Sequence, residues 1–162
     1  MKFVIDGMLG KLARWLRMMG HDVEYSNNMD DSGLLTIAKE EHRILLTRDF
    51  ALYQLAVARE VEAYYVEGRT EQEKLAELAT RFGISLEIDM ATSRCPKCNT
   101  QVKTVLTEKV AGRVEKNTLE HYTDFWECPK CGKIYWQGAH WTKIRETLKI
   151  SASLQKLKKG SA

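Results

Sequence analysis

Two aspartates that follow short apolar segments could together support metal chemistry. Residues 2–5 and 44–46 each predict a short strand buried in a sheet. Asp6 follows the first segment directly, and Asp49 follows the second after a threonine and an arginine. Because ligands of open α/β sheets bind outside the carboxyl ends of the strands, both carboxylates are expected at that edge. Two carboxylates there indicate a site for a hard cation such as Mg²⁺ or Mn²⁺.

The same aspartates also have a purely structural interpretation. An aspartate after a strand is a common turn residue and a common N-cap of the helix that follows. For either aspartate alone we favour this structural role. For Asp6 and Asp49 together we favour the cation site, because both strand segments end in the same way.

All four cysteines of the chain fall into two Cys-x-x-Cys pairs, Cys95 with Cys98 and Cys128 with Cys131. Each pair predicts a tight turn that presents two thiolates, and two such turns match a closed tetrahedral zinc site. A redox pair or another metal is the alternative. Since four thiolates leave no open coordination position, the zinc is expected to fold this module rather than to catalyse a reaction.

The N-terminal half alternates between strand and helix patterns. This alternation predicts the α/β class, with a parallel sheet of about four strands and helices on both faces. Asp30 or Asp31 is expected to cap the second helix. The expected strands are residues 2–5, 22–25, 44–46 and 61–66, and the expected helices are residues 7–20, 32–41, 50–59 and 71–82.

Charge divides the chain into two parts. Residues 1–90 contain 11 basic and 16 acidic residues, a formal charge of −5, whereas residues 91–162 contain 14 and 6, a formal charge of +8. This shift predicts a first domain over residues 1–90, a zinc-ribbon module over residues 91–145, and a basic C-terminal helix and tail over residues 146–162. The basic part is the better candidate for contact with a polyanion.

The segment between the cysteine pairs is long enough for a β-hairpin. We expect residues 102–106 to pair with residues 114–119 across a turn near Gly112. Downstream, the aromatics Tyr135, Trp136 and Trp141 could stack on bases, or they could fill the small core of the ribbon. For the two tryptophans the core role is slightly favoured.

A basic stripe is predicted on the first helix. Lys11, Arg14 and Arg17 recur at steps of three residues, which places them on one face close to Asp6. Such a stripe could guide a phosphate backbone, or it could simply be a solvated helix face.

The chain contains no apolar run of membrane-spanning length. Its N-terminal apolar run is also too short for a signal peptide. We therefore expect a cytoplasmic protein with no membrane partner. In that compartment paired cysteines favour a metal over disulfides.

Taken together, these motifs resemble the Mut7-C RNase domain family, and the resemblance covers nearly the whole chain up to the C-terminal tail. It implies a PIN-like nuclease fold followed by a zinc ribbon. The motifs that carry it are the segment from Asp6 to Arg17, Asp31-x-x-Leu34-Leu35-x-x-Ala38, Leu45-Leu46-Thr47-Arg48-Asp49, the two cysteine pairs, and Tyr135-Trp136-x-Gly138-x-His140-Trp141.

The resemblance implies a metal-dependent endoribonuclease. Asp6, Asp31 and Asp49 match the acidic residues of the family, and Asp30 and Glu67 are candidates for a fourth acid. Carboxylates would hold Mg²⁺ or Mn²⁺, and the metal would activate a water for hydrolysis of an RNA phosphodiester. Thr47 could hydrogen-bond one of the aspartates or a metal-bound water. The residues expected to bind RNA are Lys11, Arg14, Arg17, Arg48, Lys133, His140 and Trp141.

Two other functions remain open at this point. The protein could be a non-catalytic RNA- or ribosome-binding factor, in which the ribbon binds and the acids are vestigial. A toxin controlled by an antitoxin is less favoured, because the zinc ribbon suggests a processing factor. The expected partner in the favoured interpretation is RNA, with rRNA, tRNA and the ribosome as candidates.

Overall fold

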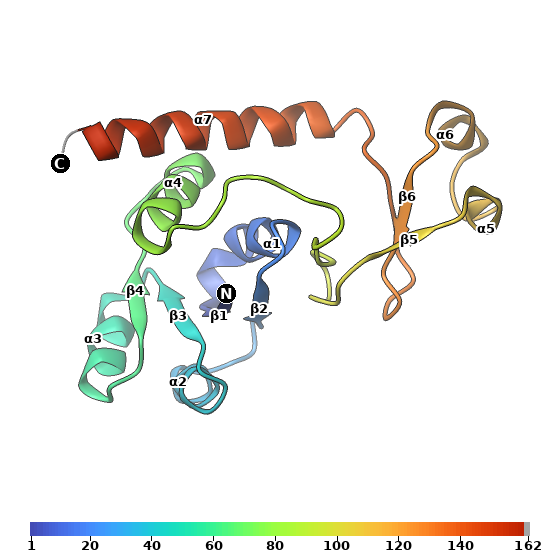
Figure 1. Cartoon of the computed structure of the whole chain (residues 1–162). Coiled ribbons are helices and arrows are strands. Elements are labelled where there is room, and N and C mark those ends of the chain that lie inside the picture. Colours follow the sequence, from blue (N-terminus) through green and yellow to red (C-terminus); the bar gives the residue numbers. More distant parts are fainter. Residues whose placement is uncertain (161–162) are drawn as a thin grey trace.

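A computed structural model describes residues 1–160 and has an α/β core followed by a small antiparallel sheet (Figure 1). Four parallel strands form the main sheet in the order β2-β1-β3-β4, which confirms the predicted class and strand number. Each strand is three or four residues long, as expected for a compact sheet. The strands are β1 (Lys2–Ile5), β2 (Asp22–Tyr25), β3 (Ile44–Thr47) and β4 (Ala63–Tyr65).

Helices cover both faces of this sheet. The chain enters the first helix through a short 3-10 turn, η1 (Gly7–Leu9), that directly follows Asp6. The apolar spacing predicted these helices, and the observed boundaries lie within three residues of the expected ones. The helices are α1 (Gly10–Met18), α2 (Asp31–Glu40), α3 (Phe50–Ala58) and α4 (Glu71–Phe82).

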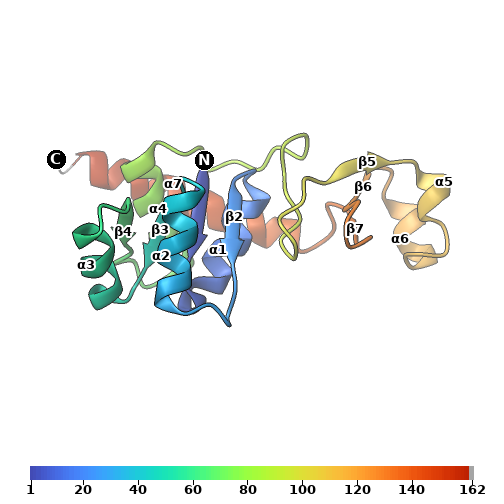
Figure 2. The same cartoon turned by 90° about the horizontal axis from the view of Figure 1, so that it is seen from below.

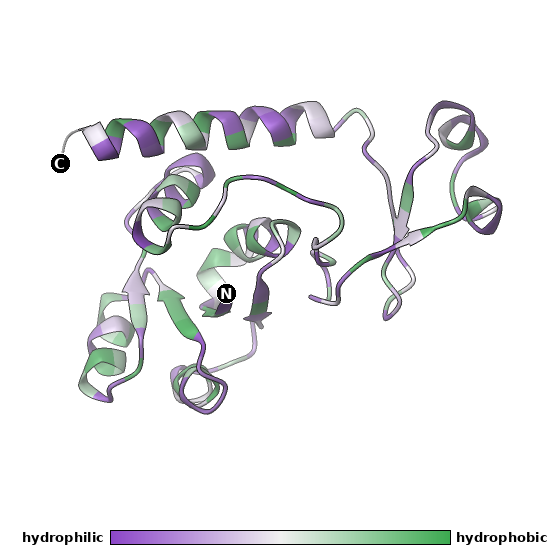
Figure 3. Ribbon diagram, in the orientation of Figure 1, coloured by the Kyte–Doolittle hydropathy of each residue, from purple (hydrophilic) through white to green (hydrophobic). Residues whose placement is uncertain are grey.

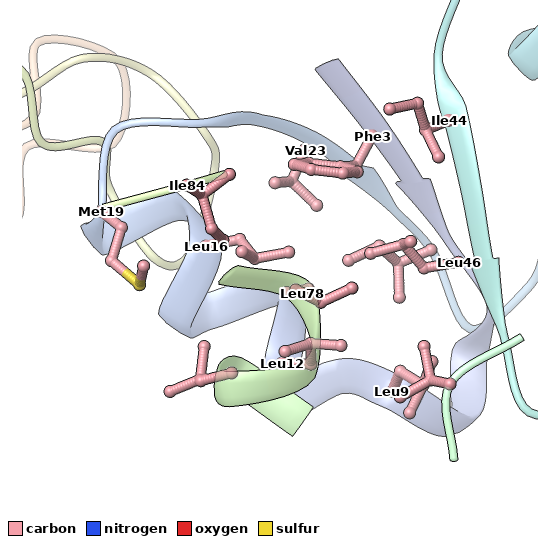
Figure 4. Close-up of a cluster of buried hydrophobic side chains, with 14 of the residues drawn as sticks. Phe3, Leu9, Leu12, Leu16, Met19, Val23, Ile44, Leu46, Leu78 and Ile84 are labelled. Carbon is pink, nitrogen blue, oxygen red and sulfur yellow. The ribbon is translucent and has the colours of Figure 1, made fainter. Parts of the chain in front are cut away.

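Two apolar cores result from this layering. On one face, Leu12 and Leu16 of α1 and Leu78 of α4 pack with Phe3 and Leu46 of the sheet (Figure 4). On the other face, α2 and α3 pack against the opposite sides of β1 and β3. Strands buried on both faces explain why these segments read as continuous apolar runs rather than as alternating ones.

The pairing between strands continues past the strand ends, at the edge where the candidate acids lie. The Asp6 amide donates to the Leu46 carbonyl at 3.1 Å, and the Val66 amide donates to the Thr47 carbonyl at 2.8 Å. The backbone on which Asp6 and Thr47 are mounted is therefore fixed by the sheet.

The second sheet differs from the expected hairpin. Its antiparallel order is β5-β6-β7, formed by β5 (Lys103–Val105), β6 (Phe125–Glu127) and β7 (Ile134–Tyr135). The predicted pairing of residues 102–106 with residues 114–119 is wrong, because β5 pairs with β6 instead. Between them lie two short helices, α5 (Thr107–Val110) and α6 (Lys116–His121).

A local apolar cluster explains this correction. Val110 and Leu119 pack around the buried Phe125 of β6, together with Val114 and Tyr122. Of the apolar residues that suggested a second strand, Leu119 lies in α6 and Val114 lies between α5 and α6, and both pack against this cluster. Residues 114–119 therefore pack around Phe125, and β6 takes the place beside β5 that they were expected to occupy.

One long helix returns from the ribbon to the first domain. α7 (Trp141–Gly160) runs along α4, and Leu148 joins the core shared by α1 and α4 (Figures 1 and 2). Figure 3 shows hydrophilic and hydrophobic residues alternating along α7, as expected for a helix with one packed face.

The predicted boundary between residues 145 and 146 falls inside α7, and the division into parts stays a prediction. Residues 161 and 162, at the end of the predicted tail, lie outside the described residues. Within residues 1–160 no helix is both long and apolar enough to cross a membrane.

Candidate carboxylate and cysteine sites

Asp6 and Asp49 meet through the side chain of Thr47. The Thr47 hydroxyl donates to Asp6 Oδ2 at 2.8 Å and accepts from the Asp49 amide at 2.9 Å, and Thr47 is fully buried. The strand order places these residues between β1 and β3, where the chain leaves β1 toward β2 and later returns to form β3. Such a reversal of strand order is the usual position of a ligand site in an open α/β sheet.

The aspartates also cap the helices that follow them. Asp6 Oδ1 accepts from the Met8 amide at 3.3 Å, and Asp49 Oδ1 accepts from the Leu52 amide at 3.2 Å. The structural role considered for these residues is therefore present. Because each carboxylate oxygen can accept more than one bond, the caps leave lone pairs on Asp6 and Asp49 for a cation.

Asp31 belongs electrostatically to the same edge. Partial burial raises the pKa of Asp31 above its ordinary value of 3.8, and repulsion from Asp49, Asp6 and Asp30 raises it further. Like charges have this effect only on a nearby carboxyl group. The exposed Asp31 at the start of α2 thus shares one negative region with the two strand-end acids.

This acidic group is open rather than tightly closed. Within residues 1–160, the four cysteines form the one group of three or more potential ligands whose donor atoms all lie within 4.8 Å of one another. The carboxylates of Asp6, Asp31 and Asp49 are spread more widely. Their chemistry suits Mg²⁺ or Mn²⁺, since Mg²⁺ is often held by one or two carboxylates together with several waters.

The two candidates for a fourth acid occupy different places. Asp30 is exposed and caps α2, accepting from the Gly33 amide at 2.8 Å. Glu67 is exposed two residues after β4, and its own amide is bound by Glu77. Neither residue joins a closed ligand group.

Glu77 is an acid that the sequence reasoning missed. It is 5% exposed, and its carboxylate accepts from the Tyr64 hydroxyl at 2.9 Å and from the amides of Glu67 and Gly68 at 2.8 Å each. Burial and the bond to Glu77 together raise the pKa of Tyr64. The signal available in the sequence was a single acid within the apolar stretch of residues 75–79. Glu77 holds the turn after β4 in place.

The predicted basic stripe is only partly exposed. Lys11 and Arg14 are exposed and line a shallow pocket with Lys74 near the start of α1. Arg17 is 6% exposed, and its guanidinium donates to the Val23 carbonyl at 2.8 and 3.1 Å. The expectation that Arg17 belongs to an exposed RNA-binding face is corrected, because this side of α1 meets the cysteine-containing part of the chain.

The Arg48 side chain also hydrogen-bonds to the backbone. Its guanidinium donates to the Gly68 carbonyl, which ties the end of β3 to the turn after β4. Arg48 is half-buried and precedes Asp49 in the chain, and its role in binding RNA stays a prediction.

The cysteine site is assembled in full. The four Sγ atoms of Cys95, Cys98, Cys128 and Cys131 lie within 4.8 Å of one another, and all four residues are free thiols. Cys95 and Cys128 are buried, and the Tyr135 hydroxyl lies 2.9 Å from Cys95 Sγ. Four soft sulfur donors converging on one point could hold a metal such as zinc.

The predicted RNA-binding residues near the second cysteine pair separate into buried and exposed ones. Trp141 is 8% exposed, and its indole donates to the Trp136 carbonyl at 3.2 Å, so its ring fills the packing between the ribbon and α7. Trp141 therefore follows the core interpretation rather than the stacking one. Lys133 and His140 are exposed, with the Lys133 ammonium 5.5 Å from the centre of the Tyr135 ring.

Comparison with known proteins gives one family. The family model described as the Mut7-C RNAse domain matches residues 1–148. Searches of curated proteins and of solved structures give no significant match. The matched range starts before β1 and ends within α7, so it contains the three aspartates and all four cysteines.

Proposed function

The chain belongs to the Mut7-C RNAse domain family, and we propose that it is a metal-dependent endoribonuclease that hydrolyses RNA phosphodiesters at the carboxyl edge of β1 and β3. The family membership suggests a nuclease. The observation that carries the proposal is the link from the Asp6 carboxylate to the Asp49 amide through the Thr47 hydroxyl, together with the pKa of Asp31, which burial raises and repulsion from these acids raises further.

Each residue at this edge has a proposed task. Asp6, Asp31 and Asp49 hold one or two Mg²⁺ or Mn²⁺ ions, which supply an activated water and neutralise charge on the phosphate. Thr47 orients the carboxylate of Asp6 and the backbone of Asp49. Lys11 on α1 draws the phosphates toward the acids, since it is exposed beside η1.

The cysteine-containing part supports this activity in two ways. We propose that the four cysteines hold one structural zinc ion, because their sulfur atoms already converge. The formal charge of +8 over residues 91–162 favours recruitment of RNA, whose affinity should fall steeply with salt.

A second candidate function is a non-catalytic RNA-binding factor. The observation that favours it is the capping role of the acids, since Asp6, Asp30 and Asp49 each hold a helix start. If these aspartates serve only as helix caps, they do not need to bind a metal ion. The two candidates differ in whether product forms in the presence of a divalent cation.

The test is cleavage of a mixed pool of structured and single-stranded RNA with Mg²⁺, with Mn²⁺ or with EDTA. The key variant is Asp49→Asn, because asparagine is as good an N-cap as aspartate and should preserve α3. Asp89→Asn is the matched control, since the exposed Asp89 also accepts a backbone N–H but lies between α4 and β5. RNA binding by all proteins is measured in parallel.

The expected result is metal-dependent cleavage by the wild type and by Asp89→Asn, and no cleavage by Asp49→Asn although it still binds RNA. Tight RNA binding without cleavage by any of the three proteins in either metal would exclude the nuclease and favour the binding factor.

A further inference from the structure

A basic groove lies between α1 and the first cysteine pair. It has a volume of about 460 Å³, in the range of pockets that hold small ligands. Its lining combines residues from both parts of the chain, and no aspartate or glutamate is among them. The charged and aromatic lining residues are Arg14, Arg17, Tyr25, Lys97, Lys133 and Tyr135.

The floor of this groove is rigid. The Arg17 guanidinium makes four hydrogen bonds to backbone carbonyls, two to Val23 and one each to Pro96 and Lys97, the last two at 2.9 and 3.4 Å. The Tyr135 hydroxyl is held by Cys95 Sγ. The acids whose charges act on Arg17, Glu24 and Asp22, are not among the lining residues.

The walls carry cations without a protein partner. Arg14 and Lys97 are exposed, and neither side chain forms a hydrogen bond or an ion pair with any of residues 1–160. Within the same residues the Lys133 ammonium forms no hydrogen bond or ion pair and lies over the face of Tyr135. Three cations around one groove repel each other until an anion enters, so the groove favours an anionic occupant.

The groove leads to the acidic edge. Gly10 and Tyr25 line the end of the groove near the start of α1. The Tyr25 hydroxyl donates at 3.1 Å to the carbonyl of Gly7, the residue after Asp6. From Gly10 to Arg17 the wall formed by α1 extends about 10 Å, at 1.5 Å per residue. A ligand lying along this wall would pass from the cysteine site to the proposed catalytic acids.

We propose that this groove binds the phosphate backbone of the RNA next to the cleaved bond, so that the first cysteine turn is part of the substrate site. This inference rests on the proposed function. The occupant is an extended polyanion, because separate cations from α1, from the first turn and from the residue after the second turn line one continuous path.

The two cysteine turns supply an unusually close control. Both have the sequence Cys-Pro-Lys-Cys, with Lys97 in the first and Lys130 in the second. Both lysines are exposed, but only Lys97 lines the groove. Lys97→Glu and Lys130→Glu therefore make the same change of charge in the same local structure.

The experiment measures anisotropy of a short fluorescein-labelled single-stranded RNA with the full chain, without added divalent cation, across a salt titration. Lys97→Glu should weaken binding by about tenfold and lower the slope of log K against log salt by about one. Lys130→Glu should change binding by less than about twofold. Zinc content of both variants checks that the turns are intact.

Two outcomes would contradict the proposal that the groove binds the RNA backbone. Equal losses in both variants would mean that the overall charge of the ribbon, not the groove, attracts RNA. Displacement of the RNA by inorganic phosphate at concentrations where chloride has no effect would mean a site for a single phosphate rather than for a chain.

RNA binding in the groove and RNA cleavage are tested in separate assays. The groove is judged by anisotropy, which needs no cleavage, and the nuclease is judged by product formation. A selective loss in Lys97→Glu together with an absence of product would retain the groove as an RNA site in a binding factor.

Discussion

The two cysteine turns share a sequence and a backbone, yet they have different positions in the molecule. In each, the residue after the second cysteine donates its amide at 2.8 Å to the carbonyl of the first cysteine. That residue is Asn99 in the first turn and Gly132 in the second, with φ angles of 69° and 76°. The local motif therefore sets the turn, including its left-handed residue.

Within residues 1–160, the first turn is the one that hydrogen-bonds to α1 and β2 of the parallel-sheet part. Asn99 Oδ1 accepts from the Val23 amide at 2.9 Å, and Asn99 Nδ2 donates to Asp22 Oδ1 at 2.8 Å. Arg17 adds its bonds to the carbonyls of the turn from the other side. Since β2 is an edge strand, the asparagine also satisfies a backbone donor that would otherwise be unpaired.

The second turn is held by a more exposed contact. Arg113 donates to the Gly132 carbonyl at 2.6 Å and also pairs with Glu127, and the Arg113 side chain is 41% exposed. The first turn, by contrast, has two arginines on its carbonyls, the buried Arg17 on Pro96 and Lys97 and the half-buried Arg94 on Asn99 at 2.9 Å. The difference shows that the residues around a metal motif, not the motif itself, attach it to a domain.

The largest effect should come from a change that the two turns share. Cys98→Ser and Cys131→Ser each remove one of four ligands, so both variants should lose zinc and the order of the ribbon. Structural zinc contributes an apparent binding free energy of about 10–16 kcal/mol in zinc-finger peptides. Elemental analysis measures zinc per chain, and limited proteolysis within residues 101–136 measures order. Full zinc occupancy in one variant alone would show that the turns bind the metal unequally.

The next effect should separate the turns. Arg17→Met removes a buried guanidinium and leaves carbonyls of Val23, Pro96 and Lys97 without donors, at a cost of about 3 kcal/mol in the free energy of unfolding. Arg113→Met removes the more exposed arginine of the second turn and should cost less than about 1 kcal/mol. Urea unfolding of zinc-loaded protein measures both. Similar values for the two variants would contradict the view that burial of Arg17 attaches the first turn.

A smaller effect is expected from exchanging the left-handed residues. Asn99→Gly keeps the conformation but loses the bonds to Asp22 and Val23, which should cost about 1–2 kcal/mol.

In the reverse variant, Gly132→Asn, the new Cβ would meet its nearest atom at 3.8 Å, so it has room. The cost of Gly132→Asn should therefore come from the positive φ alone, about 1 kcal/mol. Thermal unfolding of the two variants compares them, and a larger loss for Gly132→Asn would refute the attachment role of Asn99.

The smallest effect should depend on pH. Burial raises the pKa of Asp22, but bonds from Arg43 and Asn99 outweigh it and leave the pKa below the ordinary 3.8. A lowered pKa means that the carboxylate stabilises the fold above that value and that this contribution disappears as the pH falls through the folded-state pKa.

The measurement is the difference in unfolding free energy between the wild type and Asp22→Asn, because loss of zinc in acid affects both proteins alike. The difference should be present near pH 6 and should disappear as the pH falls through the folded-state pKa of Asp22, which lies below 3.8. A difference that does not change over this range would mean that the charge of Asp22 plays no part in holding the first turn.

Much of the first domain could be predicted because its signals are local. Apolar runs and helical spacing identified the four strands and the four helices of the first domain, and the rule for parallel sheets brought Asp6 and Asp49 to one edge. The expected hydrogen bond from Thr47 to an aspartate is confirmed at Asp6. The grouping of the four cysteines as potential ligands of one metal ion could also be predicted, since each turn is complete within a few residues.

What the sequence determined by itself was therefore the set of local elements, the strand-end acids and the two cysteine turns, because short-range spacing specifies each of them. The tertiary structure alone decided the pairing of β5 with β6 and the burial of Arg17, Trp141 and Glu77. These features depend on which surfaces meet across long stretches of chain. A charged or aromatic side chain has the same local pattern whether it faces water or a neighbouring domain, so only the packing distinguishes Arg17 from Arg14 and Lys97 from Lys130.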